Sequence, residues 1–343
     1  MKVLLIGGTG NISSQVSELA IKNGVDLYLF NRNKQIEFIP EGAKIIQGDI
    51  RNEEEAAEKL KDHSFDVVVD WIAFNTEHVK TDLRLFKEKT KQYIFISTAS
   101  AYQRPVENFI VTEETPLDNP YWDYSQNKIA CERLLLEEYI NNGFPVTIVR
   151  PSHTYGDTFI PCIFNSKKSR WSVIERMKRG KPIIVPGDGT SLWVLTHNTD
   201  FAKAFVGLLG QEKAIGQAYH ITSQDALTWD KIINILGETV GIKPKIIHIS
   251  TDFITSCLPE WKGELYGDKI NSVYFDNSKI KELVPEFKAE KPIKEGLKST
   301  IEWYLNHPEH LWIDEEWDQT CDRLIAAHQA GIQAYKENCN KLF

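Results

Sequence analysis

The amino-terminal half of the chain alternates short apolar runs with longer amphipathic segments. Residues 3–6, 26–30, 43–47, 65–69, 93–97 and 145–149 are the apolar runs. Continuous apolar runs of this length are typical of strands in a parallel sheet that helices cover on both faces. Segments such as 13–23 and 76–89 place apolar residues at helical spacing between these runs,. Strands that alternate with helices in this way predict an α/β fold with a doubly wound parallel sheet.

The second half of the chain has a weaker pattern. Beyond Arg150 short elements alternate with loops, which predicts a smaller α+β lobe,. After His307-Pro308 apolar residues return at helical spacing and predict a terminal amphipathic helix that packs on this lobe, with a lid or dimer role as the alternative. We therefore expect a sheet domain at 1–150 (with parts of 180–225 completing the sheet), a lobe at 151–306 and a helical extension at 307–343. The helical positions are Trp317, Cys321, Leu324, Ile325, His328, Ile332 and Tyr335.

Composition narrows the class of protein. The chain has 343 residues, of which 42% are hydrophobic and 26% charged, as in ordinary soluble proteins,. A formal net charge of −8 argues against a general nucleic-acid binder or a binder of anionic membranes,. No apolar run reaches the roughly 18 residues that span a bilayer, and the first run is too short for a secretion signal. Five scattered cysteines without a Cys-x-x-Cys pair predict a cytoplasmic protein with no disulfide framework and no metal site,.

A glycine-rich turn follows the first apolar run directly. Gly7-Gly8-Thr9-Gly10-Asn11-Ile12 lies between a predicted strand and a predicted helix. Glycines in this position let the backbone approach a pyrophosphate, whose charge is stabilised at the amino end of the helix. The turn therefore predicts a dinucleotide site. The third glycine of the usual pattern is replaced by Ser13, so we expect slightly looser packing of helix on strand there.

The end of the second strand bears on the choice of cofactor. An acidic residue at this point usually binds the adenosine ribose of NAD, whereas an arginine accommodates the 2′-phosphate of NADP. Asn31 and Arg32 stand here and favour NADP over NAD, with Arg32 stacked on adenine or facing solvent as the alternative. Asp49, after the third strand, is placed to contact the adenine edge; satisfying the backbone of its own turn is its alternative role.

Tyr124 and Lys128 are four residues apart in a segment, 124–141, that is predicted to be helical. Residues at this spacing share one helix face. A neighbouring ammonium lowers the pKa of a phenol, which can then exchange a proton with a substrate hydroxyl. Thr98 follows the fifth apolar run and therefore lies at a strand's carboxyl end, where open α/β sheets bind their ligands. The three side chains predict a site for hydride transfer.

Several motifs in register resemble the extended short-chain dehydrogenase/reductases, the group that contains NAD-dependent epimerases and dehydratases. The resemblance covers roughly residues 1–305 and implies a Rossmann-type doubly wound sheet with a substrate lobe. The motifs that carry it are Gly7 to Ile12, Gly48-Asp49-Ile50-Arg51, Ser97 to Tyr102, Tyr124-Ser125-Gln126-Asn127-Lys128, Arg150 to Gly156, Gly187-Asp188-Gly189, His197 to Ala202 and Phe275 to Lys279.

The resemblance also implies a role for individual residues. Thr98 would hydrogen-bond the reacting oxygen, Tyr124 would be the acid/base, and Lys128 would hold the nicotinamide ribose and lower the tyrosine pKa. The cofactor would contact the pyrophosphate turn, the adenine pocket, a small residue after the fourth strand and a proline near the nicotinamide. These cofactor positions are Gly7, Gly10, Asn11, Ile12, Asn31, Arg32, Asp49, Ile50, Ala73, Lys128 and Pro151.

Departures from the family pattern concern the substrate. Dehydratases of the group carry an acidic pair where this chain has Ala99-Ser100, which disfavours a 4,6-dehydratase. Epimerases of the group place an arginine on the substrate pyrophosphate where this chain has Trp193, so a nucleotide-diphosphate substrate is in doubt. Ser100, Trp122, His153 and Trp193 are the candidate substrate contacts, and core packing is the alternative for the tryptophans and the histidine. A basic cluster at residues 167–181 either holds a substrate phosphate or forms a solvated helix face.

Two functions follow from these patterns. The first is an NAD(P)-dependent oxidoreductase or epimerase that acts on a hydroxyl or keto carbon of a sugar or sugar-derived substrate, with NADP slightly favoured over NAD. The second is a binding module that keeps the fold without turnover, as a dinucleotide sensor or an RNA-associated protein. The retained Thr98, Tyr124 and Lys128 favour the first. We expect a small sugar-like molecule as partner, no nucleic acid or membrane, and a possible homodimer through the helix that carries Tyr124.

Overall fold

The structure is a computed structural model and describes residues 1–339, so the last four residues of the expected 307–343 extension lie outside the described residues. The chain divides into two compact units, each of which we describe by itself. The first comprises Met1–Gly156, Val194–Asp225 and Val273–Lys291, and the second comprises Asp157–Trp193, Ala226–Ser272 and Pro292–Phe343. The predicted domain boundaries stay a prediction.

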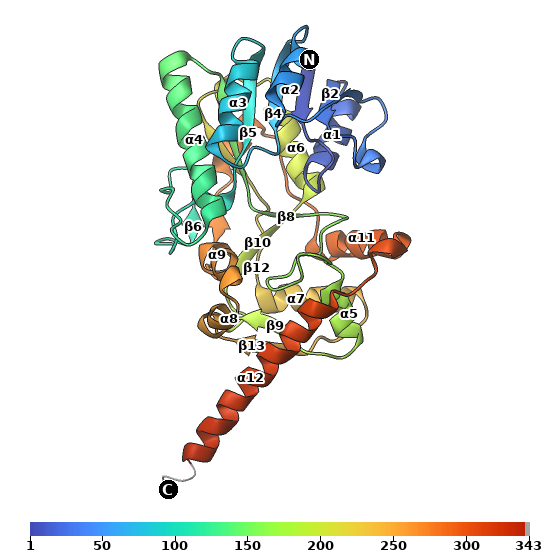
Figure 1. Cartoon of the computed structure of the whole chain (residues 1–343), viewed down its shortest axis with the longest axis vertical. Helices are drawn as coiled ribbons and strands as arrows, with labels where there is room; N and C mark the ends of the chain where they lie inside the picture. Colours follow the sequence, from blue (N-terminus) through green and yellow to red (C-terminus); the bar gives the residue numbers. More distant parts are fainter. Residues whose placement is uncertain (340–343) are drawn as a thin grey trace. The chain divides into compact units, whose positions relative to one another are not determined.

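The first unit is built on a seven-stranded parallel sheet, as expected from the apolar runs (Figure 1). Its strand order is β11-β7-β5-β4-β1-β2-β3. The central residues of the inner strands are mostly apolar and buried, as is typical of strands covered on both faces,. The strands are β1 Lys2–Ile6, β2 Asp26–Asn31, β3 Lys44–Gln47, β4 Phe65–Asp70, β5 Thr90–Ile96, β7 Val146–Pro151 and β11 Ala218–Ile221.

Helices cover both faces of this sheet. Val16, Ala20 and Phe205 bring α1 and α6 against one face, where α10 also packs. Ala56, Val79 and the buried side of α4 pack on the other face, together with α2 and α3. The Asn52 side chain accepts from the Glu55 backbone N–H and so caps α2,. The helices are α1 Ser13–Lys22, α2 Glu53–Leu60, α3 Thr76–Phe86, α4 Asp123–Asn142, α6 Asn198–Leu208 and α10 Ser278–Leu283.

The strand order reverses beside β1, which pairs with β2 on one side and with β4 on the other. Open α/β sheets bind ligands at such a switch point, outside the carboxyl ends of the strands. The remaining pieces of this unit are small: β6 Ile110–Val111 pairs with β14 Tyr274–Phe275, β8 His153–Tyr155 pairs with the end of β10 Leu192–His197, and 3₁₀ turns lie at Ile36–Phe38, Ala99–Ala101 and Glu212–Ala214.

A buried ion pair fixes α4 against the sheet. The Arg150 guanidinium at the end of β7 donates to both carboxylate oxygens of Glu132, at 3.0 Å and 2.6 Å, and both side chains are almost completely buried. The guanidinium also lies over the Tyr102 ring at 4.9 Å. Because α4 carries both Tyr124 and Lys128, this pair helps to position the predicted site.

The second unit is mainly helical around a two-stranded parallel sheet of β9 and β13. Trp193 and Trp229 stack at 5.7 Å in its core, and Trp171 stacks on Tyr304 at 5.5 Å. Its strands are β9 Ile183–Pro186, β12 Ala226–Thr228 and β13 Ile246–Ile249. Its helices are α5 Ser172–Lys178, α7 Trp229–Thr239, α8 Thr251–Cys257, α9 Lys262–Glu264, α11 Ile293–Asn306 and α12 Glu315–Cys339, with 3₁₀ turns at Pro259–Trp261 and Pro308–His310 and a π-turn at Leu265–Lys269.

The basic cluster of residues 167–181 holds the start of α12. Arg176 is buried and donates to Asp318 at 2.5 Å, and Lys181 reaches the same carboxylate at 2.5 Å. The solvated-face interpretation was therefore wrong for Arg176. Lys168 and Arg179 are exposed, as that interpretation expects, and both pair with carboxylates. This pairing leaves little charge for a substrate phosphate.

The terminal helix α12 was predicted correctly, but its packing face was only partly right. Cys321, Leu324 and Ile325 are buried within the second unit, as the helical spacing indicated. Ile332 and Tyr335 are 45% and 71% exposed, so the prediction that they pack on the lobe was wrong. The apolar residues keep their helical spacing beyond Ile325, although the helix no longer buries that face at Ile332 and Tyr335.

Candidate functional site

Buried polar atoms without a hydrogen-bond partner gather along the carboxyl edge of the sheet in the first unit. Each follows or ends a different strand, from β1 to β5. Buried polar atoms in folded proteins nearly always have partners, so unpartnered groups at a ligand-binding edge indicate a place where a ligand binds. The atoms are Asn11 Oδ1, Asn31 Nδ2, Arg51 Nη1, Trp71 Nε1 and Ser97 Oγ.

The glycine turn has the open backbone that a pyrophosphate requires. Gly7 and Gly8 have φ of 100° and 93°, a region that favours glycine,. A Cβ on Gly8 would lie 2.7 Å from Leu29 Cδ2, so a larger residue there would combine backbone strain with a displaced Leu29 side chain. Ser13, in place of the third family glycine, accepts from the Gly10 N–H through its hydroxyl at 2.9 Å. The residues present therefore fit a dinucleotide, although the Gly10 N–H is already engaged.

Polar side chains lie at the end of β2 and after β3, where the sequence predicts the adenosine half of a dinucleotide to bind. Asn31 Oδ1 accepts from the Asn33 N–H at 2.9 Å, which leaves the Asn31 Nδ2 group as an unpartnered donor. Arg32 Nη1 lies 3.9 Å from Asp49 Oδ2, and the two side chains are 62% and 42% exposed. Ile50 is buried beside them. Asp49 Oδ1 also accepts from the Arg51 N–H, the turn-stabilising role that the sequence left open.

Lys128 is the most unusual charged group of the site because it is 2% exposed. Its Nζ donates to the carbonyl oxygens of Ala73 and Ile96, both at 2.7 Å. The rings of Phe74, Phe95 and Tyr124 lie 5.0, 4.8 and 5.9 Å from Nζ. Burial lowers the pKa of Lys128 to about 8, against the opposing effect of Asp70,. Lys128 therefore titrates close to neutral pH.

A chain of hydroxyls joins the strand end to α4. Thr98 Oγ1 lies 3.0 Å from Ser100 Oγ, which lies 2.7 Å from Ser125 Oγ at the residue after Tyr124. The Tyr124 ring packs against Trp122 at 5.0 Å. The hydroxyls thus connect Thr98 to the residue after Tyr124, and Lys128 Nζ lies 5.9 Å from the Tyr124 ring. A hydroxyl, a phenol and an ammonium so placed can bind a carbonyl or hydroxyl oxygen and exchange a proton with it.

The other predicted residues are placed as follows. Pro151 is the last residue of β7. Ala73 is buried, and its carbonyl oxygen accepts from Lys128 Nζ. His153 lies on β8 of the first unit. Trp193 belongs to the second unit, where it is 3% exposed and stacked on Trp229, a core-filling position. The role of each of these residues at a ligand stays a prediction.

Two acidic residues escaped the sequence-based reasoning. Asp70 ends β4 and Asp82 lies within α3, and both are completely buried. The sequence does contain a sign of the buried Asp82. This residue shares a helix face with apolar Val79 and Phe86, where burial of a carboxylate costs free energy,. Arg51 Nη2 lies 3.7 Å from Asp70 Oδ2 and donates to the Ile72 carbonyl at 2.6 Å, so Arg51 also belongs to this group.

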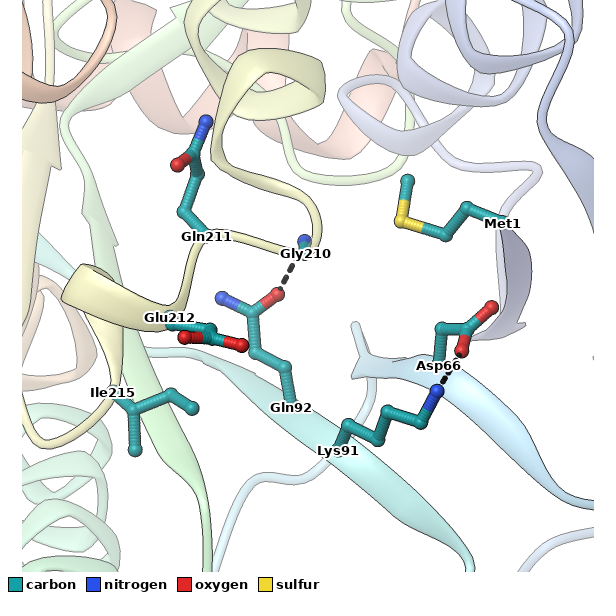
Figure 2. A pocket seen from close by; sticks show the side chains of 8 residues that line it. All are labelled: Met1, Asp66, Lys91, Gln92, Gly210, Gln211, Glu212 and Ile215. Carbon is teal, nitrogen blue, oxygen red and sulfur yellow. Dashed lines mark hydrogen bonds and ion pairs between the residues drawn. The ribbon is translucent and has the colours of Figure 1, made fainter.

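A cavity of about 340 Å³ in the first unit lies at the opposite edge of the sheet (Figure 2). Asp66, Lys91 and Gln92 line it from the amino ends of β4 and β5. The other lining residues are Met1, Gly210, Gln211, Glu212 and Ile215. The buried Gln92 amide accepts from the Gly210 N–H and donates to Leu208 O. Because this cavity lies away from the carboxyl ends, it is not the predicted nucleotide site.

The model of the NAD-dependent epimerase/dehydratase family matches residues 3–222. The chain belongs to this family. The match covers most of the first unit, including the glycine turn and the Tyr124–Lys128 segment. The family assignment and the parallel sheet confirm the resemblance expected from the motifs.

Relatives of this epimerase/dehydratase chain differ in what their names describe. A chloroplast stem-loop binding protein of 41 kDa (b) from Arabidopsis thaliana is 29% identical over 261 residues, which cover 72% of this chain and 65% of that protein. A dTDP-D-glucose 4,6-dehydratase from Homo sapiens is 22% identical over 342 residues, covering 92% and 93% of the two chains. The chain thus spans just under two thirds of the first relative, and 47% of a trifunctional UDP-glucose 4,6-dehydratase of Arabidopsis thaliana.

Solved structures of the family share the fold. A dTDP-glucose 4,6-dehydratase from Bacillus anthracis in complex with NAD has a TM-score of 0.71 at 21% identity and covers 92% of this chain and 99% of its own. A UDP-glucuronic acid 4-epimerase from Bacillus cereus, in complex with UDP-glucuronic acid and NAD, has a TM-score of 0.72 at 20% identity, with 90% and 100% covered. Within residues 1–339, no helix combines the length and apolar character needed to cross a bilayer.

Proposed function

We propose that this protein is an NAD(P)-dependent oxidoreductase or epimerase that acts on a hydroxyl or keto carbon of a sugar or sugar-derived substrate. The observation that carries the proposal is the environment of Lys128. Its buried ammonium is fixed by the carbonyls that follow β4 and end β5, and it lies 5.9 Å from the ring of Tyr124. An ammonium held in this way beside a phenol has a chemical use in proton transfer, whereas a purely structural lysine rarely accepts such burial.

Each side chain has a role in this proposal. Thr98 donates a hydrogen bond to the substrate oxygen, with Ser100 and Ser125 behind it to orient the hydroxyl. Tyr124 gives its phenolic proton to that oxygen or takes one from it. Lys128 favours the phenolate of Tyr124 by its charge and holds the nicotinamide ribose. When bound, the nicotinamide supplies the acceptor and donor of the hydride.

The substrate pocket differs from that of sugar-nucleotide dehydratases and epimerases. Ala99-Ser100 offer no acid for the elimination of water, so the proposed chemistry stops at the exchange of a hydroxyl and a carbonyl. Trp193 replaces the arginine expected on a substrate pyrophosphate and is buried in the second unit. An epimerase returns the hydride to the opposite face and keeps its cofactor, whereas a reductase releases it. Net absorbance change at the nicotinamide band with candidate sugars and NADP(H) therefore separates the two.

Replacement of Tyr124 by Phe tests the mechanism. This variant keeps the ring and loses the proton, so we expect turnover to fall by about 10²-fold or more while cofactor affinity stays within about twofold. Tyr139→Phe is the matched control, because Tyr139 lies on the same helix and is 37% exposed. Turnover that survives in Tyr124→Phe would refute the assigned acid/base.

NADP is the preferred cofactor in this proposal. The Asn31 side chain has an unpartnered Nδ2 donor, and the Arg32 guanidinium lies near it in sequence; in this proposal both donate charge-assisted hydrogen bonds to the 2′-phosphate,. Arg32→Ala should weaken NADP⁺ binding by about tenfold or more and leave NAD⁺ binding unchanged, as measured by calorimetry. Arg84→Ala, which removes another exposed arginine with a carboxylate partner, is the control. Equal losses for both cofactors would contradict an NADP preference.

A second candidate function is the RNA-associated or sensor module. The 29% identical relative that is named a stem-loop binding protein supports it. The net charge of −8 and the retained Thr98, Tyr124 and Lys128 weigh against it. A gel-shift titration with stem-loop RNA decides between them: salt-sensitive binding without turnover on any sugar would favour this second function.

A further inference from the structure

Asp70 and Asp82 form a buried pair of carboxyl groups beneath the proposed site. Both residues are 0% exposed, Asp70 at the end of β4 and Asp82 in α3. Asp82 Oδ2 accepts from the Tyr93 hydroxyl at 2.6 Å, and Asp70 Oδ1 accepts from the Ile72 N–H at 2.5 Å. The other oxygen of each group, Asp82 Oδ1 and Asp70 Oδ2, is buried without a hydrogen-bond donor.

A proton shared between Asp70 and Asp82 would satisfy both of these oxygens. Two adjacent carboxylates cannot both stay ionised in a water-free interior, and a protonated carboxyl donates to its ionised neighbour. Burial, and next to it the charge of Asp70, raises the pKa of Asp82 well above its ordinary value. The two oxygens without a donor, Asp70 Oδ2 and Asp82 Oδ1, belong to these two groups, so one proton held by Asp82 and shared with Asp70 would give both of them a hydrogen bond,.

The charged and titratable neighbours of the pair come from every element around it. Arg51 follows β3, and its Nη2 lies 3.7 Å from Asp70. Tyr93 faces Asp82 from β5. His78 on α3 and Lys128 and Cys131 on α4 also sense the Asp70 charge: burial lowers the pKa of His78 and of Lys128, and the Asp70 charge opposes this lowering. Asp70 is thus the anion between two cations, Arg51 and Lys128.

The Asp70–Ala73 turn links this anion to Lys128 mechanically as well. Asp70 holds the Ile72 N–H, and Arg51 donates to the Ile72 carbonyl at 2.6 Å. The next carbonyl, that of Ala73, accepts from Lys128 Nζ at 2.7 Å. Any change in the ionisation of Asp70 is therefore transmitted to Lys128 through both its charge and the geometry of this turn.

We propose that Asp70 and Asp82 are positioning residues for Lys128: Asp82 keeps a proton that it donates to Asp70, and the Asp70 carboxylate fixes the turn on which the ammonium is held. The inference rests on the proposed function for its catalytic meaning, because Lys128 is the group that would hold the ribose and act on Tyr124. No proton is lost or gained when substrate turns over; the pair holds its proton throughout.

The titration of the Lys128 amine in the cofactor-free protein tests the inference. NMR of protein with isotope-labelled lysine side chains follows the amine against pH, and Lys128→Arg identifies its signal. Asp70→Asn removes the charge and should lower the Lys128 midpoint by about one unit. Asp82→Asn keeps an N–H donor for Asp70 and an acceptor for Tyr93, so the midpoint should stay unchanged. Asp66→Asn is the matched control, because it makes the same substitution at the opposite end of β4, where the side chain is 36% exposed.

A second measurement needs no variant to fold. Infrared spectra of wild-type protein with carboxyl-labelled aspartate should contain the carbonyl stretch of a protonated carboxyl at neutral pH. Absence of that band, or a Lys128 midpoint that moves equally in Asp70→Asn and Asp66→Asn, overturns the inference. The proposed function fails separately: if NADP⁺ does not change the wild-type Lys128 signal while Asp70→Asn still shifts its midpoint, the cofactor assignment is wrong and the positioning pair remains.

Discussion

The burial of Lys128 makes the stability of the first unit depend on pH in a direction that can be worked out. The pKa of Lys128 is about 8 in the folded chain, where burial is the dominant cause, and 10.5 is the ordinary value that it regains on unfolding. The unfolded chain therefore binds this proton more tightly than the folded chain. The Lys128 contribution to the free energy of unfolding therefore rises with pH from about 8 to 10.5. In this window the unfolded chain still binds the proton and the folded chain does not.

The expected size of this effect follows from the two midpoints. Linkage gives an increase of about 2 kcal/mol in the free energy of unfolding between roughly pH 7.5 and pH 10 from Lys128 alone,. Lys128→Met removes the titrating group, so the difference in unfolding free energy between wild type and this variant isolates the contribution. Contributions from other titrating groups cancel in the difference as far as they are independent of Lys128.

Urea denaturation of the cofactor-free protein at a series of pH values is the assay. Fluorine NMR of fluorotryptophan-labelled protein reports the first unit through Trp71, which follows β4, so unfolding of the second unit does not interfere. Lys87→Met, at an exposed lysine of the same unit, is the control and should show no such rise. A wild-type minus Lys128→Met difference that stays constant, or falls with pH, would refute the reasoning from burial.

Two further substitutions test what holds the site in place. Glu132→Ala leaves the Arg150 guanidinium buried without its carboxylate, and we expect a loss of about 3–5 kcal/mol in urea denaturation,; a loss below about 1 kcal/mol would contradict the role given to this pair. Gly8→Ala combines a φ of 93° with a contact of 2.7 Å to Leu29, whereas Gly24→Ala has a φ of 75° and open space around its Cβ. Gly8→Ala should therefore cost about 1–3 kcal/mol more than Gly24→Ala in thermal denaturation, and equal costs would argue against a tightly packed turn.

Local patterns in the sequence determined the elements and the edge on which the site lies. Six apolar runs became strands of the seven-stranded sheet, and the inner strands among them are apolar because helices cover them on both faces,. The glycine turn follows β1 as predicted, since a positive φ at Gly7 and Gly8 is a requirement of the backbone itself,. The spacing of Tyr124 and Lys128 is sufficient by itself to place both on one face of α4, because residues four apart in a helix lie one above the other.

Only the tertiary structure decided which charges meet inside the protein. Asp70 and Asp82 are twelve positions apart in sequence, and their shared proton depends on the packing of α3 on β4. The basic residues of 167–181 appeared free in the sequence, yet Asp318 and its neighbours on α12 neutralise most of them. Ile332 and Tyr335 followed the helical pattern and are exposed all the same. Periodicity reports the local geometry of a helix or strand, whereas burial and pairing depend on partners that are distant in sequence and that folding alone brings together.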